Sequence, residues 1–349
     1  MTAMLQSWLR WAGYPYELAA RLRLWGYTRG WFETHRLPRP VISIGNLTVG
    51  GTGKTPVVMH VVDRLTAQGK RVAILSRGYR RRSKAPQLLV SDGRQVLAGP
   101  EEAGDEPYLM ARRCPHAIVA VGADRYALGQ WVLSRLPLDC FVLDDGFQHL
   151  KVKRDLDIVL IDATNPFGNN QMLPTGILRE SLSGLKRADA IVVTRANLVK
   201  DVSKIKAEIL RINPNCQIFV SQNKFINAVK LKELLSKEST DQKSKIKNLK
   251  LMAFCALGNP DNFYEQLRQE KFNLVATKSF PDHHIYSNSE MRNLEKEAIE
   301  KGTEVLLTTA KDAVKLTHLR FNLPCYVIEN GLTFEDESAF VNLIQNPKN

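Results

Sequence analysis

A glycine-rich loop ending in Gly53-Lys54-Thr55 is the feature that most limits what this chain can fold into. An apolar run at Val41–Ile44 precedes the loop, and a segment with helical apolar spacing begins at Pro56, a residue suited to the first turn of a helix. In this order these parts form a phosphate cradle: backbone N–H groups surround the β-phosphate, the lysine reaches the β- and γ-oxygens, and the threonine hydroxyl ligates Mg²⁺. We therefore expect nucleotide phosphates to contact Thr48, Val49, Gly50, Gly51, Thr52, Gly53, Lys54 and Thr55.

The loop departs from the usual pattern at one position. That pattern has a glycine five positions before Gly53, whereas this chain has Thr48. We expect Gly50 and Gly51 to supply the backbone freedom instead, because glycine adopts positive φ without steric cost.

The rest of the chain predicts an α/β fold. After Pro40, apolar and β-branched runs alternate with helical or loop segments, which is typical of a three-layer, P-loop NTPase-like domain with a mainly parallel sheet. The runs are Val41–Gly45, Arg71–Ser76, Ala117–Val121, Cys140–Leu143, Asp157–Ile161 and Ala190–Thr194. Further runs predict a second, smaller α/β unit, at Leu251–Leu257, Leu274–Phe280, Val305–Thr309 and Cys325–Ile328.

We expect three parts along the chain: N-terminal amphipathic helices over residues 1–39, a P-loop core over 40–200, and a smaller C-terminal α/β lid over 201–349. Residues 224–250 are rich in lysine, serine, threonine and asparagine and poor in large apolar residues. This composition favours an exposed helix and a solvated linker within the third part.

The first 39 residues are rich in tryptophan and arginine. Four of the five tryptophans lie there, and six arginines against two glutamates give the segment a net charge of +4. Leu18, Leu22 and Trp25 recur at helical spacing. Rings and arginines on one helix suit the headgroup layer of a membrane, but the same stripe is also compatible with packing on the domain behind it.

The net charge indicates the kind of partner, and the cysteine content indicates the kind of compartment. The 349-residue chain has 49 lysines and arginines against 36 acidic residues, a net charge of +13, which favours anionic partners such as nucleic acid, phosphorylated metabolites or a membrane surface. Its five cysteines are scattered with no CxxC pair, as in proteins of a reducing compartment. We expect neither a membrane-spanning segment nor a secretory signal, because no long uncharged apolar run occurs.

Acidic residues follow several of the predicted strands. Asp144 and Asp145 end the run at Cys140–Leu143, at the sheet edge where a metal-binding acid is expected, and Asp162 is a rival with the same form. Asp105 and Glu106 lie in a turn-rich segment, where they either face the nucleotide or cap the next helix.

Two further groups are ambiguous on the residues alone. His283 and His284 lie in a polar loop, where one of them either assists a carboxylate base or is simply exposed. The arginine-rich stretch around Arg77 and Tyr79 suits a phosphate clamp, a solvated face or, less well, nucleic-acid binding, for which no known motif is present.

Eight motifs in order resemble the tetraacyldisaccharide 4′-kinase family of the lipid A pathway over nearly the whole chain. The motifs are residues 40–56, Ser76–Tyr79, Gly104–Pro107, Gly122–Arg125, Asp144–His149, Leu173–Glu180, Phe280–His284 and Thr309–Lys315. The resemblance implies ATP-dependent phosphorylation of the 4′-hydroxyl of a tetraacyldisaccharide 1-phosphate, giving lipid IVA. It also implies peripheral attachment to the cytoplasmic face of the bacterial inner membrane, with neither nucleic acid nor an obligate protein partner.

The resemblance also implies residue roles. Asp105 corresponds to the family's catalytic base and His283 to its orienting partner, which replaces helix capping as the role expected for Asp105. The residues expected to bind Mg²⁺ are Thr55, Asp144 and Asp145, with Glu106 as a helper. The residues expected to contact the sugar phosphate are Arg77, Tyr79, Arg125, Gln148, His149 and Arg179.

Some positions depart from the family, and two rival functions remain to be weighed. Ala310 replaces a usual glutamate, Ala256–Pro260 varies a Gly-Ile-Gly-Asn-Pro pattern, and the lysine-rich stretch near 237–250 is particular to this chain. A membrane-bound regulatory ATPase or GTPase needs no hydroxyl-activating dyad and hydrolyses nucleotide without lipid. A nucleic-acid module predicts salt-sensitive binding that survives loss of Lys54.

Overall fold

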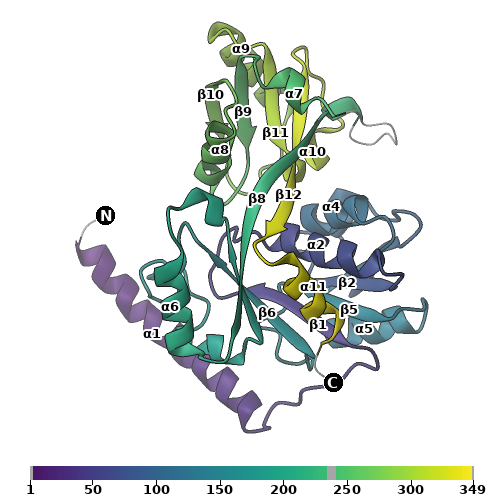
Figure 1. Cartoon of the computed structure of the whole chain (residues 1–349), viewed down its shortest axis with the longest axis vertical. Coiled ribbons are helices and arrows are strands. Elements are labelled where there is room, and N and C mark those ends of the chain that lie inside the picture. Colours follow the sequence, from purple (N-terminus) through teal and green to yellow (C-terminus); the bar gives the residue numbers. More distant parts are fainter. Residues whose placement is uncertain (1–2, 234–240, 348–349) are drawn as a thin grey trace.

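The structure is a computed structural model that describes residues 3–233 and 241–347, with side chains from Pro15 onward. Its centre is one twelve-stranded sheet with the order β10-β9-β11-β12-β8-β7-β6-β1-β5-β2-β4-β3. The sheet is shared by two lobes, which Figure 1 shows joined by the long strands β8 (Gln217–Lys230) and β12 (Cys325–Phe334).

The N-terminal lobe has a parallel sheet whose buried strands explain their continuous apolar sequences. Its strands are β1 (Val41–Asn46), β2 (Val72–Ser76), β3 (Gln87–Asp92), β4 (Ile118–Gly122), β5 (Cys140–Asp144), β6 (Leu156–Asp162) and β7 (Ala190–Thr194). Only β3 pairs in the antiparallel sense among them. The helical segments are α2 (Lys54–Thr66), α3 (Pro100–Ala103), α4 (Asp105–Arg113), α5 (Arg125–Leu133), α6 (Ser203–Ile212), η1 (Leu182–Arg187) and η2 (Ala196–Leu198).

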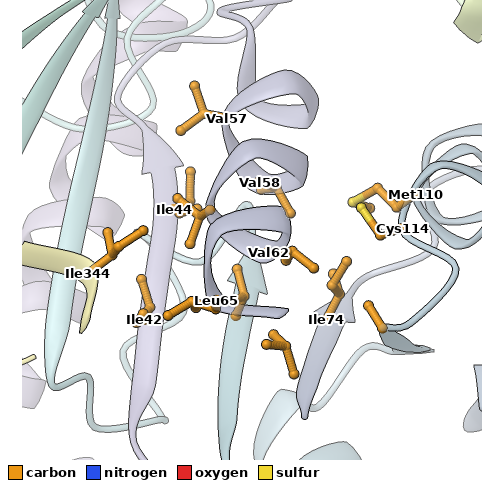
Figure 2. Packing of buried hydrophobic residues seen from close by; sticks show 14 of the residues in the cluster. Ile42, Ile44, Val57, Val58, Val62, Leu65, Ile74, Met110, Cys114 and Ile344 are labelled. Carbon is orange, nitrogen blue, oxygen red and sulfur yellow. The ribbon is translucent and has the colours of Figure 1, made fainter. Parts of the chain in front are cut away.

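Helices cover both faces of this sheet, which confirms the predicted three-layer architecture. On one face, α2 and α4 form a buried cluster with β1 and β2, joined by the C-terminal helix α11 (Glu337–Gln345). Figure 2 shows Val58, Val62 and Leu65 of α2 between Ile44 of β1 and Ile74 of β2. On the other face, α5 and α6 each pack against a separate cluster.

The C-terminal lobe repeats this arrangement on a smaller scale. Its remaining strands are β9 (Leu251–Cys255), β10 (Leu274–Ser279) and β11 (Val305–Thr309). Its helical segments are η3 (Leu231–Glu233), α7 (Lys243–Ile246), α8 (Pro260–Gln269), α9 (Asn288–Glu300) and α10 (Ala310–Leu316). One face is covered by α9 and α10 and the other by α8. The predicted division at residue 200 stays a prediction, and the structure adds that α11 returns to the N-terminal lobe.

The prediction of an exposed helix and linker over residues 224–250 is wrong at the start of the segment, because residues 224–230 belong to strand β8. Lys224 and Lys230 are exposed, but Phe225 and Val229 between them are buried. The pattern is that of a strand paired along its length with β12, a partner about a hundred residues away. Residues 234–240 of the expected linker lie outside the described residues.

A single helix, α1 (Ala3–Thr28), takes the place of the expected N-terminal helices, and it runs along the lower left side of the molecule in Figure 1. Its apolar stripe points outward: Leu18, Leu22 and Trp25 are 58%, 53% and 41% exposed. The stripe therefore does not pack on the domain behind it. Among the helices in the described part of the chain, none is both long and apolar enough to cross a membrane.

We expect Phe340→Ala to lower the free energy of unfolding by about 3–5 kcal/mol, because truncating a buried aromatic side chain leaves a cavity. The Phe340 ring is fully buried, stacks on Phe334 of β12 at 4.0 Å between centroids and meets Phe219 of β8. Chemical denaturation followed by circular dichroism measures the change. Ile299→Ala, at a side chain 60% exposed on α9, is the control and should change stability by less than about 0.5 kcal/mol. Equal losses in the two variants would contradict the packing role of α11.

Candidate active site

The glycine-rich loop lies between the end of β1 and the start of α2, as predicted. Gly50 and Gly53 have φ values of 101° and 83°, in the region that only glycine adopts freely, so the loop needs glycine at both. The Lys54 ammonium donates to Asn46 Oδ1 at 3.1 Å and lies 3.5 Å from a carboxylate oxygen of Asp145. The lysine is therefore held over the loop, at the N-terminus of a thirteen-residue helix.

Asp144 and Asp145 have different surroundings, although they are neighbours at the end of β5. Asp144 is 3% exposed and accepts a hydrogen bond from Ser76 Oγ at 2.7 Å. Burial, together with the nearby charges of Glu106 and Asp145, raises the pKa of Asp144 to about 6.

Asp145 has an unusual positive φ of 54° and forms ion pairs with Lys54 and Arg179. Burial favours the neutral form, but these two cations outweigh it and lower the pKa of Asp145. The rival Asp162 is paired with Arg195 and accepts from Thr164, so its carboxylate is occupied elsewhere.

Asp105 and His283 are brought together from opposite lobes. Asp105 is the first residue of α4, and its Oδ2 lies 3.2 Å from His283 Nδ1. Burial favours the neutral acid, but His283, Lys315 and Lys311 outweigh it and hold the pKa of Asp105 below its ordinary value. The carboxylate is therefore ionised and able to accept a proton. The neighbouring His284 turns away, stacking on Phe280 and contacting a glutamate of α9.

Several other contacts join the lobes around this pair. Lys311 of α10 contacts Glu106 of α4 at 3.0 Å, and Lys315 lies 3.6 Å from Asp105. Arg80 donates to the backbone carbonyl of Asp282 at 2.9 Å. The acidic start of α4 is thus covered by a basic face of α10.

A cavity of about 890 Å³ lies between the two lobes and α1. Most of the predicted site residues line it, namely Val49 to Thr55, Arg77, Tyr79, Glu106, Asp144, Asp145, Gln148, Arg179 and His283. Helix α1 contributes Tyr16 and Arg23, which bond to the backbone carbonyls of Arg179 and Gln148. The loop, the paired acids and the outer helix therefore face one common space.

Four predicted site residues are not among those that line the cavity: Thr48, Asp105, Arg125 and His149. Asp105 contacts His283, which does line the cavity, and the carbonyl of Thr48 accepts a hydrogen bond from Asn46. Arg125 is 4% exposed and folds back on the carbonyls of Gly122 and Ala123. Burial and then the charge of Arg125 lower the pKa of His149 to about 4, so its ring is neutral.

Four polar residues of the site had no predicted role of their own. Asn46 and Ser76 each end a parallel strand, where polar side chains meet ligands. Their position in the sequence could therefore have identified them as site residues. Lys311 and Lys315 lie in a motif that the family resemblance had already singled out, but their partners on α4 come from about two hundred residues earlier.

The oxygen donors at the loop suit Mg²⁺ held jointly with phosphates. Within residues 3–233 and 241–347, no group of three His, Cys, Asp or Glu side chains is arranged to hold a metal ion. Mg²⁺ at nucleotide sites commonly takes one or two carboxylates and completes its shell with phosphate and water. Asp144 fits this role, because it lines the same cavity as Thr55, Glu106 and Asp145, so that their oxygen atoms face one common space.

Comparisons with known proteins agree over most of the chain. A family profile described as Tetraacyldisaccharide-1-P 4′-kinase matches residues 5–348. A Tetraacyldisaccharide 4′-kinase of Geobacter metallireducens is 43% identical over 302 residues, 86% of each chain, and one of Geobacter sulfurreducens is 40% identical over 312 residues, 89% of this chain and 84% of that protein. A crystal structure of LpxK from Aquifex aeolicus in complex with ATP superposes with a TM-score of 0.78 at 35% identity, covering 99% of this chain and 100% of that chain.

We expect Lys54→Met to weaken binding of a nucleoside triphosphate by about tenfold or more, because it removes a charge-assisted contact to the phosphates. Isothermal titration calorimetry measures the dissociation constant. The control is Lys278→Met, which removes a lysine paired with Glu297 outside the cavity lining. Unchanged affinity in Lys54→Met would contradict the phosphate role of the loop.

Proposed function

This chain belongs to the tetraacyldisaccharide-1-phosphate 4′-kinase family, and we propose that it transfers the γ-phosphoryl group of ATP to the 4′-hydroxyl of a tetraacyldisaccharide 1-phosphate, forming lipid IVA in lipid A biosynthesis. The observation that carries the proposal is the Asp105–His283 pair, whose histidine lines the same cavity as the glycine-rich loop. Hydrolysis of a nucleotide by a switch protein does not need a carboxylate–histidine pair of this kind, whereas activation of a sugar hydroxyl does.

In the proposed reaction, Asp105 accepts the proton of the 4′-hydroxyl as its oxygen attacks the γ-phosphorus and the bond to the β-phosphate oxygen breaks. The His283 ring, whose Nδ1 lies 3.2 Å from Asp105 Oδ2, fixes the direction of the carboxylate. Lys54 contacts the β- and γ-phosphate oxygens and stabilises the negative charge that develops during transfer. We further propose that the C-terminal lobe acts as a lid that excludes water, which otherwise competes with the hydroxyl.

The same site provides the residues to hold Mg²⁺. Thr55, Asp144 and Asp145 would bind the ion, with Glu106 as a helper, and the ion would neutralise phosphate charge when bound. Ser76 orients Asp144 through its 2.7 Å hydrogen bond, so the carboxylate is positioned before any ligand arrives.

Arginines around the cavity support binding of the phosphorylated sugar. Arg77, Tyr79, Gln148 and Arg179 line the cavity and would contact the disaccharide and its 1-phosphate. Arg125 and His149 lie behind this surface, so their expected contacts with the sugar phosphate need either a movement or an indirect role. We propose the indirect role: His149 belongs to the segment that carries Gln148, and Arg125 fixes the turn after β4 through two backbone carbonyls.

The two faces of helix α1 support a location for the acyl chains and the membrane. Its outer face exposes Leu18, Leu22 and Trp25, while its inner face lines the cavity through Tyr16 and Arg23. We propose that the outer face lies in the headgroup layer at the cytoplasmic face of the inner membrane, which makes the enzyme peripheral. A lipid drawn from that surface then has its sugar close to the loop.

We expect label from γ-³²P-ATP to appear in tetraacyldisaccharide 1-phosphate presented in detergent micelles. Asp105→Asn should lower kcat by about 10²- to 10⁴-fold, the usual contribution of general acid–base catalysis, because an amide cannot accept the proton. Thin-layer chromatography of the lipid measures the transfer. Lys278→Met is the control and should keep full activity. Phosphate release without labelled lipid would indicate a nucleotide switch instead, and ordinary turnover in Asp105→Asn would contradict the base assignment.

We expect the double variant Leu18→Ser, Leu22→Ser to bind vesicles containing anionic phospholipid at least tenfold more weakly, because two exposed apolar side chains no longer enter the interface. Co-flotation with the vesicles measures binding. Leu210→Ser on α6 removes a leucine that is 44% exposed on another helix and should leave binding unchanged. Equal binding by the double variant and the unmodified protein would exclude this face as the membrane contact.

A further inference from the structure

Lys311 and Asp105 contact opposite nitrogens of the His283 ring. The His283 ring lies between the two: Nδ1 is 3.2 Å from Asp105 Oδ2, and Nε2 is 3.3 Å from the Lys311 ammonium nitrogen. The same ammonium lies 3.0 Å from Glu106 Oε1 and 3.3 Å from Asp282 Oδ1. Its three protons thus have three acceptors, one of which is the imidazole nitrogen.

This geometry restricts the protonation of the ring. An ammonium group only donates hydrogen bonds, so the nitrogen that faces it must accept. Nε2 therefore carries the lone pair, which leaves the ring proton on Nδ1, the nitrogen that faces Asp105. With the opposite tautomer, an unprotonated Nδ1 would face the carboxylate and an Nε2 proton would face the ammonium, so both contacts would be repulsive.

Two carboxylates and His283 surround the Lys311 ammonium, and one of these carboxylates competes with the lysine for Nε2 of the histidine. The competitor is Asp282 Oδ2, which lies 3.8 Å from Nε2 and would attract a proton there if the lysine were absent. Lys315 of the same helix lies 3.6 Å from Asp105 but has no contact with His283 among those of the described residues.

We propose that Lys311 is a positioning residue that sets the tautomer of His283. It thereby keeps the proton on Nδ1, where the N–H group donates to Asp105. The inference rests on the proposed function, in which Asp105 is the base. Both the His283 and Lys315 contacts of Asp105 fall on its Oδ2. Because Lys311 also bonds to Glu106, the correct tautomer forms when α10 meets α4.

Long-range ¹H–¹⁵N correlation spectra of the ¹⁵N-histidine-labelled, nucleotide-free protein test the proposal, because protonated and unprotonated ring nitrogens resonate in separate regions. His283→Gln identifies the signal. We expect the neutral Nδ1–H form in the unmodified protein and its loss in Lys311→Met, where Asp282 draws a proton to Nε2. In the lipid assay, kcat of Lys311→Met should fall about 10- to 100-fold, within the range of general acid–base effects, with an unchanged KM for ATP.

Three variants separate positioning from structural damage. Lys311→Arg keeps a group that only donates and should keep the Nδ1–H form and most of the activity. Lys315→Met removes the same charge one helical turn away and should leave the tautomer unchanged. Lys278→Met should change neither readout. Circular dichroism melting confirms that each variant is folded.

An unchanged tautomer in Lys311→Met would overturn the proposal, and so would a changed tautomer with undiminished kcat. Failure of the function itself has a different signature. If the unmodified protein labels no lipid, the kinase assignment fails, while the spectra still decide whether Lys311 sets the tautomer.

Discussion

The antiparallel pairing of β8 with β12 determines how the two lobes face each other. β8 runs parallel to β7, and β12 runs parallel to β11, so the strands of the two lobes point in opposite directions. Because the lobes are also displaced along these long strands, the carboxyl ends of both sheets point toward the space between them (Figure 1). Ligands of open α/β sheets bind at the carboxyl ends of strands, and here two such edges share one cavity. The glycine-rich loop and Asp144 come from one edge, and His283 and Lys311 from the other.

Charge pairing prepares this cavity for a polyanionic ligand. Lys54 and Arg179 are held by Asp145, and Lys311 is held by Glu106 and Asp282. Partly buried cations of this kind need compensation, since an unpaired charge in a protein interior is costly. When phosphates enter the cavity, Lys54 and Arg179 can exchange one anionic partner for another without being moved into place first.

Local sequence was sufficient where a segment is buried on both sides. β7 and β11 have the predicted bounds, and the loop and Asp144 lie where the motif placed them. β8 was missed because its lysines alternate with buried residues against a strand that is distant in the sequence. The same reason applies to the site: Asp105 and His283 are 178 positions apart, and family resemblance, not spacing, paired them. The burial of Arg125 depends on carbonyl groups that only the folded backbone presents.

Backbone strain connects the two sides of the cavity. Asp145 and His283, one from each lobe, have φ values of 54° and 62°, a conformation that costs non-glycine residues of order 1–3 kcal/mol. Each is held by charged partners: Asp145 by Lys54 and Arg179, and His283 by Asp105 and Lys311. For His283 these partners lie on α4 and α10, so the contact between the lobes helps to offset the strain. His283 and Asp105 come from different lobes, so their contact exists only while the two lobes meet.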